Sequence, residues 1–278
     1  MTTKIINIEE NLKKIISDMG NVIVAYSGGV DSSYLMDVSN DVLGDKALAV
    51  MSFSPSVAED DRQDAVNLAK KKNWNYKIIN TQEMEDENYV KNDINRCFFC
   101  KDELYGKLVE LSDELDFDWV LNGSNLDDKG DYRPGMNAAK LHKVRSPLIE
   151  AEFTKKDIRD YAEKRNLDTW DKPASPCLSS RLPYGTKVTM EALLMVSKSE
   201  KYLRSLGFRI VRVRHYDQKA LIEIPKDKFS EYKSNKNKIV KTLASYGYSE
   251  VELDLSLIHI SEPTRQEAMS YAVFCLKK

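Results

Sequence analysis

The chain has 278 residues, of which 42% are hydrophobic and 31% charged, as is typical of one or two globular domains. Its 42 lysines and arginines against 44 aspartates and glutamates give a net charge of −2, which argues against a general attraction to nucleic acid. No apolar run is long enough to span a bilayer, the start is not typical of a signal peptide and the 4 cysteines do not suggest a secreted disulfide framework, so we expect a cytoplasmic protein without a membrane partner.

The predicted elements of the first two-thirds of the chain alternate between helix and strand. In chain order they are a helix over 8–19, a strand over 21–26, a helix over 30–43, a strand over 46–53, a helix over 57–72, a strand over 76–80, a helix over 101–115, a strand over 119–122 and a helix over 154–165. Gly44 is suited to end the second of these helices as a C-cap. This alternation predicts an α/β fold with a parallel sheet, helices on both of its faces and ligands at the carboxyl ends of its strands.

The turn after the predicted strand 21–26 has the sequence Ser27-Gly28-Gly29-Val30-Asp31-Ser32-Ser33. Backbone N–H groups and the helix dipole at such a junction favour an anion, and the two glycines let the backbone lie close to a phosphate. Asp31 is suited to hold Mg²⁺ beside it. Further donors to phosphate oxygens are the hydroxyls of Ser27, Ser32 and Ser33.

This turn lacks the Gly-Lys-Ser/Thr of kinases and GTPases. It resembles instead the pyrophosphate-binding SGGxDS loop (PP-loop) of the ATP pyrophosphatases, which have an adenine nucleotide alpha hydrolase-like fold and split ATP into AMP and pyrophosphate. The alternative interpretation is an ordinary junction between a strand and a helix. The position of the motif between a buried strand and a helix favours the nucleotide-binding interpretation.

The pattern changes near Asp171, where a loop with two prolines covers residues 172–177. The elements predicted beyond it are a helix over 191–206 stopped by Gly207, paired strands over 209–215 and 220–224, a helix over 227–246 and a strand over 251–255. We therefore expect an ATP-pyrophosphatase domain over residues 1–172 and a smaller α+β domain for substrate binding or oligomerisation over 186–255.

Cys97 and Cys100 form a Cys-x-x-Cys pair, and Cys177 is the remote third cysteine. A pair at this spacing can chelate one metal or two irons of a cluster, because both sulfurs converge at a turn, and three thiolates suit a [4Fe–4S] cluster with one open iron. Zinc is an alternative, although it usually needs a fourth ligand, for which His142 is the nearest candidate. A thioredoxin-like dithiol and three unconnected thiols are the remaining interpretations.

Several longer motifs carry a resemblance to a known family, the LarE family of ATP-dependent sulfur transferases, over about residues 10–255. They are the PP-loop, Asp131-Tyr132-Arg133-Pro134-Gly135, the run from Pro173 to Gly185, the run from Glu200 to Phe208, and Val211-Arg212-Val213-Arg214. The resemblance implies that ATP and Mg²⁺ adenylate a carboxylate of a pyridinium mononucleotide, with release of pyrophosphate. Sulfur then displaces AMP and leaves a thiocarboxylate, a step in the synthesis of the nickel-pincer nucleotide cofactor of lactate racemase.

The family resemblance also bears on the source of the sulfur. Some members give up the sulfur of a single cysteine at the Cys177 position, whereas members with the extra Cys-x-x-Cys hold a [4Fe–4S] cluster that carries a spare sulfide. Cys97 and Cys100 place this chain in the second group, with a sulfide donor as a partner. The family further implies a homo-oligomer.

Charge considerations suggest roles for further residues. The substrate carries a phosphate, and guanidinium groups bind phosphate well, so we place Arg181, Arg212 and Arg214 around it. Arg212 and Arg214 alternate along a predicted strand and are expected to point to one face. The predicted catalytic set is Asp31, Cys177, Arg181 and Glu200, the last orienting an arginine. We also expect Arg133 to bind the substrate, with Asp128 as a further candidate for such a contact. His215 lies beside Arg214, so it is a candidate to reach the same pocket and act as a general base.

Other functions of the same loop stay open at this point. They are a tRNA thiolase, a ligase resembling NAD or GMP synthetase, a sulfur transferase that sacrifices its cysteine, and a regulator that senses AMP or ATP. The net charge does not favour tRNA, and no glutaminase region is evident.

The stretch from Ser256 to Lys278 departs from the family and resembles translated sequencing-adapter sequence. We expect it to be an artefact that replaces the genuine C-terminus, in which case His259 and Cys275 have no function. A lineage-specific helix within 266–276 is the alternative.

Overall fold

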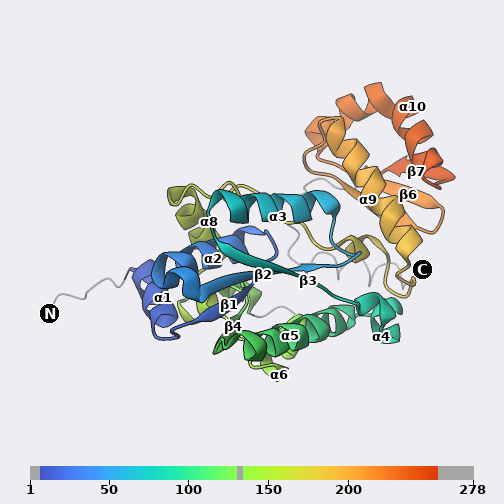
Figure 1. Cartoon of the computed structure of the whole chain (residues 1–278). Coiled ribbons are helices and arrows are strands. Elements are labelled where there is room, and N and C mark those ends of the chain that lie inside the picture. Colours follow the sequence, from blue (N-terminus) through green and yellow to red (C-terminus); the bar gives the residue numbers. More distant parts are fainter. Residues whose placement is uncertain (1–6, 130–133, 256–278) are drawn as a thin grey trace. The chain divides into compact units, whose positions relative to one another are not determined.

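The computed structural model describes residues 7–129 and 134–255 and divides into two compact units. The first unit consists of Met1–Tyr89 and Asn95–Lys172, and the second of Val90–Ile94 and Pro173–Lys278. Figure 1 gives the elements of both. Arg133, Asp131 and the stretch 256–278 lie outside the described residues, so their predicted roles are not addressed by the structure.

The first unit contains a four-stranded parallel sheet with the strand order β3-β2-β1-β4. Its strands are β1 (Val22–Ala25), β2 (Ala47–Phe53), β3 (Asn75–Asn80) and β4 (Trp119–Leu121). In β1 and β2 alternate residues face opposite sides, because successive side chains of a strand point to opposite faces. Val24 thus enters one hydrophobic core and Ile23 the other.

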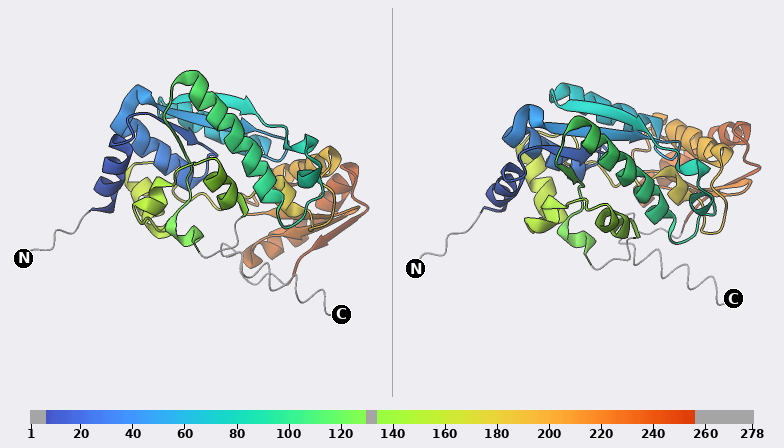
Figure 2. Two further views of the ribbon diagram at one scale, coloured as in Figure 1. Left: turned by 90° about the horizontal axis from the view of Figure 1, so that it is seen from below. Right: turned by 60° about the horizontal axis from the view of Figure 1, so that its bottom comes forward.

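Helices cover both faces of this sheet, as the sequence predicts (Figures 1 and 2). One core packs under α1 (Ile8–Ser17), α2 (Val30–Leu43), α3 (Glu59–Lys71) and α8 (Lys155–Lys164). The other packs under α5 (Arg96–Leu115) and α6 (Pro134–Leu141). Short helices α4 (Glu87–Val90) and α7 (Pro147–Glu150) were not predicted. The α/β fold class of the sequence analysis is confirmed.

Two helices of the first unit show where local signals suffice and where they fail. The predicted helix 30–43 is confirmed as α2, and Gly44 ends it with φ of 56° and an N–H that donates to Asn40 O. The predicted start of the helix at residue 101 is wrong, because α5 already begins at Arg96. The side chain of its N-cap residue, Asn95, makes no capping hydrogen bond and its first turn holds no acidic residue, so the usual start signals are incomplete.

An ion-pair network fixes the far end of α8 to α1 and α2. The guanidinium of Arg165, the C-cap residue of α8, lies 2.7 Å from Glu9, 3.0 Å from Asp37 and 3.2 Å from Asp41. The other end of α8 has Thr154 as its N-cap, in a capping box with Asp157. With both ends held, α8 places its first residue, Lys155, at a defined position.

The second unit has a three-stranded sheet of order β5-β6-β7, antiparallel between β5 and β6 and parallel between β6 and β7. Its elements are α9 (Met190–Ser205), β5 (Arg212–Tyr216), β6 (Lys219–Glu223), α10 (Phe229–Ser245) and β7 (Glu250–Leu253). The predicted strand pair around a polar turn is confirmed, although β5 begins three residues later than expected. A separate core, with Phe208 and Val213 fully buried, holds these elements together.

No helix in the two described ranges combines the length and the apolar composition needed to cross a bilayer.

Candidate active site

The PP-loop connects the end of β1 to the start of α2, with Gly29 as the N-cap of the helix. Gly28 has φ of 73°, in the region that favours glycine, and a Cβ placed there would lie 2.8 Å from Ala65 Cβ of α3. The Ser32 hydroxyl donates to Gly29 O at 3.2 Å, accepts from Ser27 N at 3.2 Å and lies 3.1 Å from Ser27 Oγ. Internal hydrogen bonds therefore shape the loop.

Ser33 does not fit its predicted role as a phosphate donor. Its side chain is fully buried on α2, and its hydroxyl has no hydrogen-bond partner in the described part of the chain. Successive residues in the first turn of a helix point to different sides, and the side chain of Ser33 points into the core. Ser27 is exposed and keeps the position that the prediction requires.

Asp31, in the first turn of α2, is paired with a residue that the sequence analysis missed. Lys155 Nζ lies 2.7 Å from Asp31 Oδ2, and Asn125 Nδ2 donates to Asp31 Oδ1 at 3.4 Å. A sequence separation of 124 residues hides this ion pair from any local pattern. The carboxylate predicted to hold Mg²⁺ is thus balanced by a lysine.

The loop after β4 packs directly against the PP-loop helix. A Cβ on Gly123 would lie 2.9 Å from Ser32 N, so only glycine lets the two backbones approach this closely. Asp127 Oδ2 accepts from the backbone N–H of Lys155 at 2.7 Å. The expectation of a substrate contact from Asp128 does not fit the structure, because this buried carboxylate forms a capping box with Asn125. Arg133 follows in the segment that is not described.

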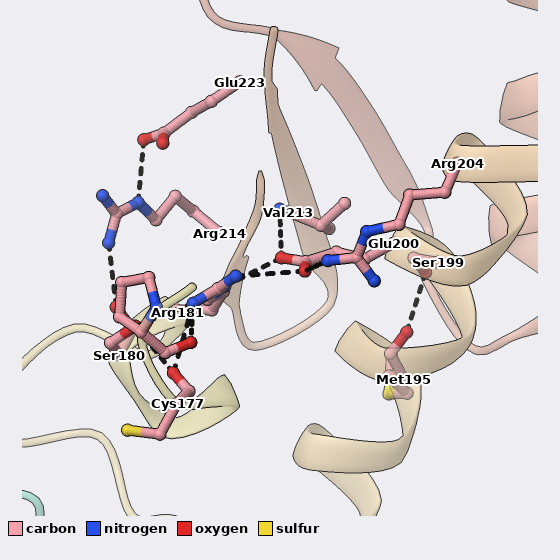
Figure 3. A network of polar contacts seen from close by, with 11 residues as sticks. Cys177, Ser180, Arg181, Met195, Ser199, Glu200, Arg204, Val213, Arg214 and Glu223 are labelled. Atoms are coloured by element: carbon pink, nitrogen blue, oxygen red, sulfur yellow. Dashed lines mark hydrogen bonds and ion pairs between the residues drawn. The ribbon is translucent and has the colours of Figure 1, made fainter. Parts of the chain in front are cut away.

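In the second unit, Arg181 and Glu200 form a buried, two-armed ion pair (Figure 3). Arg181 Nε lies 2.8 Å from Glu200 Oε1 and Nη2 lies 3.1 Å from Oε2, with 3% and 0% of the two side chains exposed. Burial is the largest single influence on the pKa of Arg181 and lowers it, but the charge and hydrogen bonds of Glu200, together with the charges of Cys177 and Glu223, outweigh burial and raise that pKa. Arg181 also donates to Cys177 O at 3.2 Å, which fixes the turn that carries the cysteine.

Glu200 has further partners that sequence reasoning did not find. Arg204, one turn further along α9, reaches Oε2 at 3.0 Å, and the backbone N–H of Val213 donates to Oε1 at 3.1 Å. A fully buried carboxylate needs such partners, because an unpaired buried charge is costly. Glu200 therefore joins α9, β5 and the Cys177 turn, in agreement with the expectation that it orients an arginine.

Arg212 and Arg214 lie on the same side of β5, as predicted, while the residues between and after them are buried. Arg214 is held by Glu223 Oε1 at 2.7 Å and by Ser180 O at 2.8 Å. Arg212 has no hydrogen-bond or ion-pair partner among the residues described. Burial, followed by the charges of Arg181 and Arg214, lowers the pKa of Arg212. An anion would relieve this repulsion.

Known proteins resemble this chain both in the PP-loop region and over most of its length. A family described as NAD synthase matches residues 4–98, which contain the PP-loop. An uncharacterized protein of Synechocystis is 41% identical over 88% of this chain and 92% of its own. The pyridinium-3,5-bisthiocarboxylic acid mononucleotide synthase of Lactiplantibacillus plantarum is 35% identical over 86% of this chain and 87% of its own. The chain belongs to the LarE family. It is an ATP-using sulfurtransferase.

An uncharacterized protein of Methanocaldococcus jannaschii is also similar to this LarE-family chain, with 30% identity over 91% of this chain and 96% of its own.

His215 lies on the buried face of β5, which contradicts one prediction made for this LarE-family chain. The expectation that it reaches the pocket of Arg214 is wrong, because alternation along β5 turns His215 to the opposite, buried face. There its Nδ1 lies 3.1 Å from Tyr248 Oη, and burial lowers its pKa. A neutral, buried imidazole packed on the core does not contact the arginine face.

The three cysteines named in the sequence analysis form no disulfide among the described residues, and each is half-buried. Cys97 and Cys100 are the second and fifth residues of α5. They therefore lie three positions apart on a helix and not in a loop turn. Cys177 is the N-cap of a short 3₁₀ helix over Leu178–Arg181. Within residues 7–129 and 134–255, no three His, Cys, Asp or Glu side chains are grouped so that they could hold a metal ion.

Proposed function

We propose that this LarE-family protein uses ATP to adenylate a carboxylate of a pyridinium mononucleotide and then converts that carboxylate to a thiocarboxylate. The observation that carries the proposal is Arg212, whose guanidinium has no partner within residues 7–129 and 134–255 and feels the charge of Arg181, which in turn holds the turn of Cys177. The name of the Lactiplantibacillus plantarum relative supports the same substrate class. The thiocarboxylate product would serve the nickel-pincer nucleotide cofactor of lactate racemase.

The arginine cluster of the second unit has the charge that a phosphate monoester needs. Three guanidinium groups share two carboxylates and a fourth, that of Arg212, is not paired with either, which gives an excess of two positive charges. The set is made of Arg181, Arg204, Arg212, Arg214, Glu200 and Glu223. A phosphate monoester carries a charge of about −1.5 to −2 at neutral pH, so one such group balances the cluster. We assign the substrate phosphate to residues 186–255 together with Arg181.

We assign the nucleotide to the region up to residue 172. The hydroxyl of the exposed Ser27 and the backbone of Gly28 and Gly29 would bind a pyrophosphate at the start of α2. The donor chemistry fits Mg²⁺, because Asp31 offers carboxylate oxygens, which this cation prefers. When bound, Mg²⁺ would neutralise charge on the phosphates of ATP.

Two substitutions account for all atoms of the proposed reaction. A carboxylate oxygen of the mononucleotide attacks the α-phosphorus of ATP, and the bond from that phosphorus to the β-phosphate oxygen breaks as pyrophosphate leaves. A sulfur nucleophile then attacks the acyl carbon, and the bond to the AMP oxygen breaks as AMP leaves with the electron pair. Arg181 and Arg212 would hold the substrate phosphate, and Glu200 would keep Arg181 in place.

For the sulfur we propose a [4Fe–4S] cluster on Cys97, Cys100 and Cys177, reloaded by a sulfide donor. The chemistry of three thiols suits such a cluster, since iron–sulfur clusters are held by cysteine thiolates, but no three such side chains are grouped for a metal ion in the described ranges. A bound cluster would supply an open iron for the transferable sulfide. If no cluster forms, the Cys177 thiolate makes the same acyl substitution and gives a thioester. Loss of the Cα proton of Cys177 then breaks its Cβ–Sγ bond, so the sulfur leaves as the thiocarboxylate and dehydroalanine remains in the chain.

Turnover of anaerobically purified protein tests this proposal. We expect ATP and the pyridinium dicarboxylate mononucleotide, but not tRNA, to release pyrophosphate and AMP, with iron bound and Cys177 unchanged in mass. Iron-free protein that loses one cysteine sulfur per product would reject the cluster and keep the transferase. Absence of pyrophosphate release with this mononucleotide would reject the function itself.

Arg212→Met tests the phosphate site separately. Charge-assisted hydrogen bonds contribute about 1.5–3 kcal/mol, so the KM for the mononucleotide should rise roughly 10- to 150-fold with the KM for ATP unchanged. Arg212→Lys is the matched control and should recover part of the affinity, because it keeps the charge but not the fork of donors. An unchanged KM in Arg212→Met would remove Arg212 from the site.

A further inference from the structure

The ion pair between Asp31 and Lys155 occupies the carboxylate that the proposed ATP step needs for Mg²⁺. Lys155 Nζ lies 2.7 Å from Asp31 Oδ2, and the amide of Asn125 reaches Oδ1. The two side chains are 28% and 24% exposed, so the pair can separate toward solvent without leaving a buried, unpaired charge. A divalent cation on Asp31 would lie against the ammonium group of Lys155 and be repelled by it.

The position of Lys155 is not explained by the needs of its own helix. It is the first residue of α8, where the helix dipole disfavours a positive charge. Its neighbour Lys156 differs in this respect, since it is 83% exposed and pairs within the helix with Asp160 at 2.6 Å. Asp127 holds the backbone N–H of Lys155, and Arg165 anchors the far end of α8. The fold therefore holds this ammonium group over the PP-loop helix.

We propose that Lys155 is an exchangeable counter-ion that couples the binding of Mg²⁺ to the binding of ATP. The proposal rests on the proposed ATP-using function and deepens it. Without ligands, Lys155 neutralises Asp31. When Mg²⁺ and ATP bind together, the metal takes the Asp31 carboxylate and the released ammonium group pairs with a phosphate.

Because of this exchange, Mg²⁺ and ATP should each bind weakly when the other is absent. Mg²⁺ alone must displace Lys155 and leave its charge beside the metal, whereas ATP alone must bring phosphates toward the Asp31 carboxylate. Among the ligand-bound states, only the one with both ligands gives Asp31 and Lys155 each a partner of opposite charge. Coupling free energies between two ligands typically correspond to 5- to 150-fold changes in affinity, so the effect is measurable.

Two affinities of Lys155→Met test the proposal. The first is Mn²⁺ binding to the nucleotide-free protein, measured by the loss of the electron paramagnetic resonance signal of free Mn²⁺. The second is the binding of α,β-methylene ATP at saturating Mn²⁺, measured by equilibrium dialysis. Neither needs the mononucleotide or a sulfur source. We expect the first affinity to rise about tenfold and the second to fall about tenfold, because removing the ammonium group frees Asp31 but leaves a phosphate unpaired.

Matched variants make the outcome decisive. Lys156→Met removes the same charge one residue along and should change neither affinity, Lys155→Arg should keep Mn²⁺ binding weak, and Asp31→Asn gives the background for other Mn²⁺ sites. Lys155→Gln replaces Lys155→Met if thermal melting shows that the latter is unfolded. A purely structural lysine would lower both affinities, and a simple phosphate ligand would lower only the second, so either result overturns the coupling. Wild-type protein that binds no nucleotide even with Mn²⁺ would overturn the ATP-using function as well.

Discussion

The PP-loop of the first unit and the arginine cluster of the second are both suited to anions, but their charges are balanced in different ways. Around the PP-loop the donors belong largely to the backbone, and the one acidic side chain of the motif is neutralised by Lys155 across a partly exposed contact. In the cluster the donors are guanidinium groups, and Glu200 and Glu223 fix three of them in buried or half-buried pairs.

This difference separates two ways of preparing a binding site. An ion pair that water reaches contributes less to stability than a buried one, so the partly exposed Asp31–Lys155 contact can be exchanged for ligand contacts at small cost. Breaking a buried pair such as Arg181–Glu200 leaves an uncompensated charge in the protein interior and is costly. We infer that the first site rearranges when its ligands arrive, whereas the second is held ready for its phosphate.

Glu200→Gln should break the second site most severely. Removing the charge leaves Arg181 buried with only neutral acceptors, and losing one partner of a buried pair costs about 3–5 kcal/mol. We expect a loss of this size in the free energy of urea unfolding of the second unit, together with loss of mononucleotide binding. Glu191→Gln, at an exposed position in the first turn of the same helix, is the control and should stay within about 0.5 kcal/mol of wild type. Equal effects of the two variants would contradict the view that the cluster is preorganised.

Gly28→Ala should break the first site through the backbone rather than through charge. The residue has φ of 73°, and the added Cβ would meet Ala65 Cβ at 2.8 Å, so the loop must move. Strain of this kind costs about 1–3 kcal/mol, and we expect ATP binding to be lost with it, as measured by urea unfolding and calorimetry.

Two further variants separate the causes of that loss. Adding Ala65→Gly to Gly28→Ala removes the close contact but not the left-handed backbone, so it should restore only part of the stability. Gly29→Ala, whose nearest contact would be Ser27 Oγ at 3.5 Å, should cost less than Gly28→Ala. Equal losses at the two glycines would show that the contact with α3 is unimportant.

The sequence predicted features that depend on neighbouring residues. The helix from Val30 to Leu43 and the common face of Arg212 and Arg214 follow from a local cap and from strand alternation, and both were confirmed. The same alternation, applied to His215, would have shown that it faces away from its neighbour Arg214. That error came from treating adjacency in sequence as adjacency in space.

Most of the residues that the sequence analysis missed make contacts that are distant along the chain. Lys155 lies 124 residues from Asp31, and Glu223 reaches Arg214 only because β5 and β6 pair in one register. Such contacts depend on the tertiary fold, which no periodicity along the chain encodes. Arg204 lies one turn from Glu200 on α9, and helix spacing alone could have identified it.

The smallest predicted effect concerns the buried face of β5, behind the arginines. His215 has a pKa below its ordinary value because of burial, which outweighs the charges of Asp217 and Glu191, and the Tyr248 hydroxyl beside it stays neutral because burial raises its pKa. The unfolded chain therefore binds a proton more readily than the folded chain. The stability contribution is complete above pH 6.5, the ordinary pKa of histidine, and decreases as the pH falls toward the lower folded pKa.

His215→Gln removes this titration and should flatten the pH dependence of urea unfolding between pH 7.5 and pH 5.5. At pH 7.5 the variant should cost about 1 kcal/mol, the usual worth of a hydrogen bond such as the one to Tyr248. His142→Gln is the control, since that histidine is half-buried and pairs with Asp102 on the first unit. If wild type and His215→Gln lose stability equally on acidification, the buried histidine does not limit the second unit. The arginine face would then owe its rigidity to the carboxylates alone, because the imidazole behind β5 would be free to take up a proton without disturbing the strand.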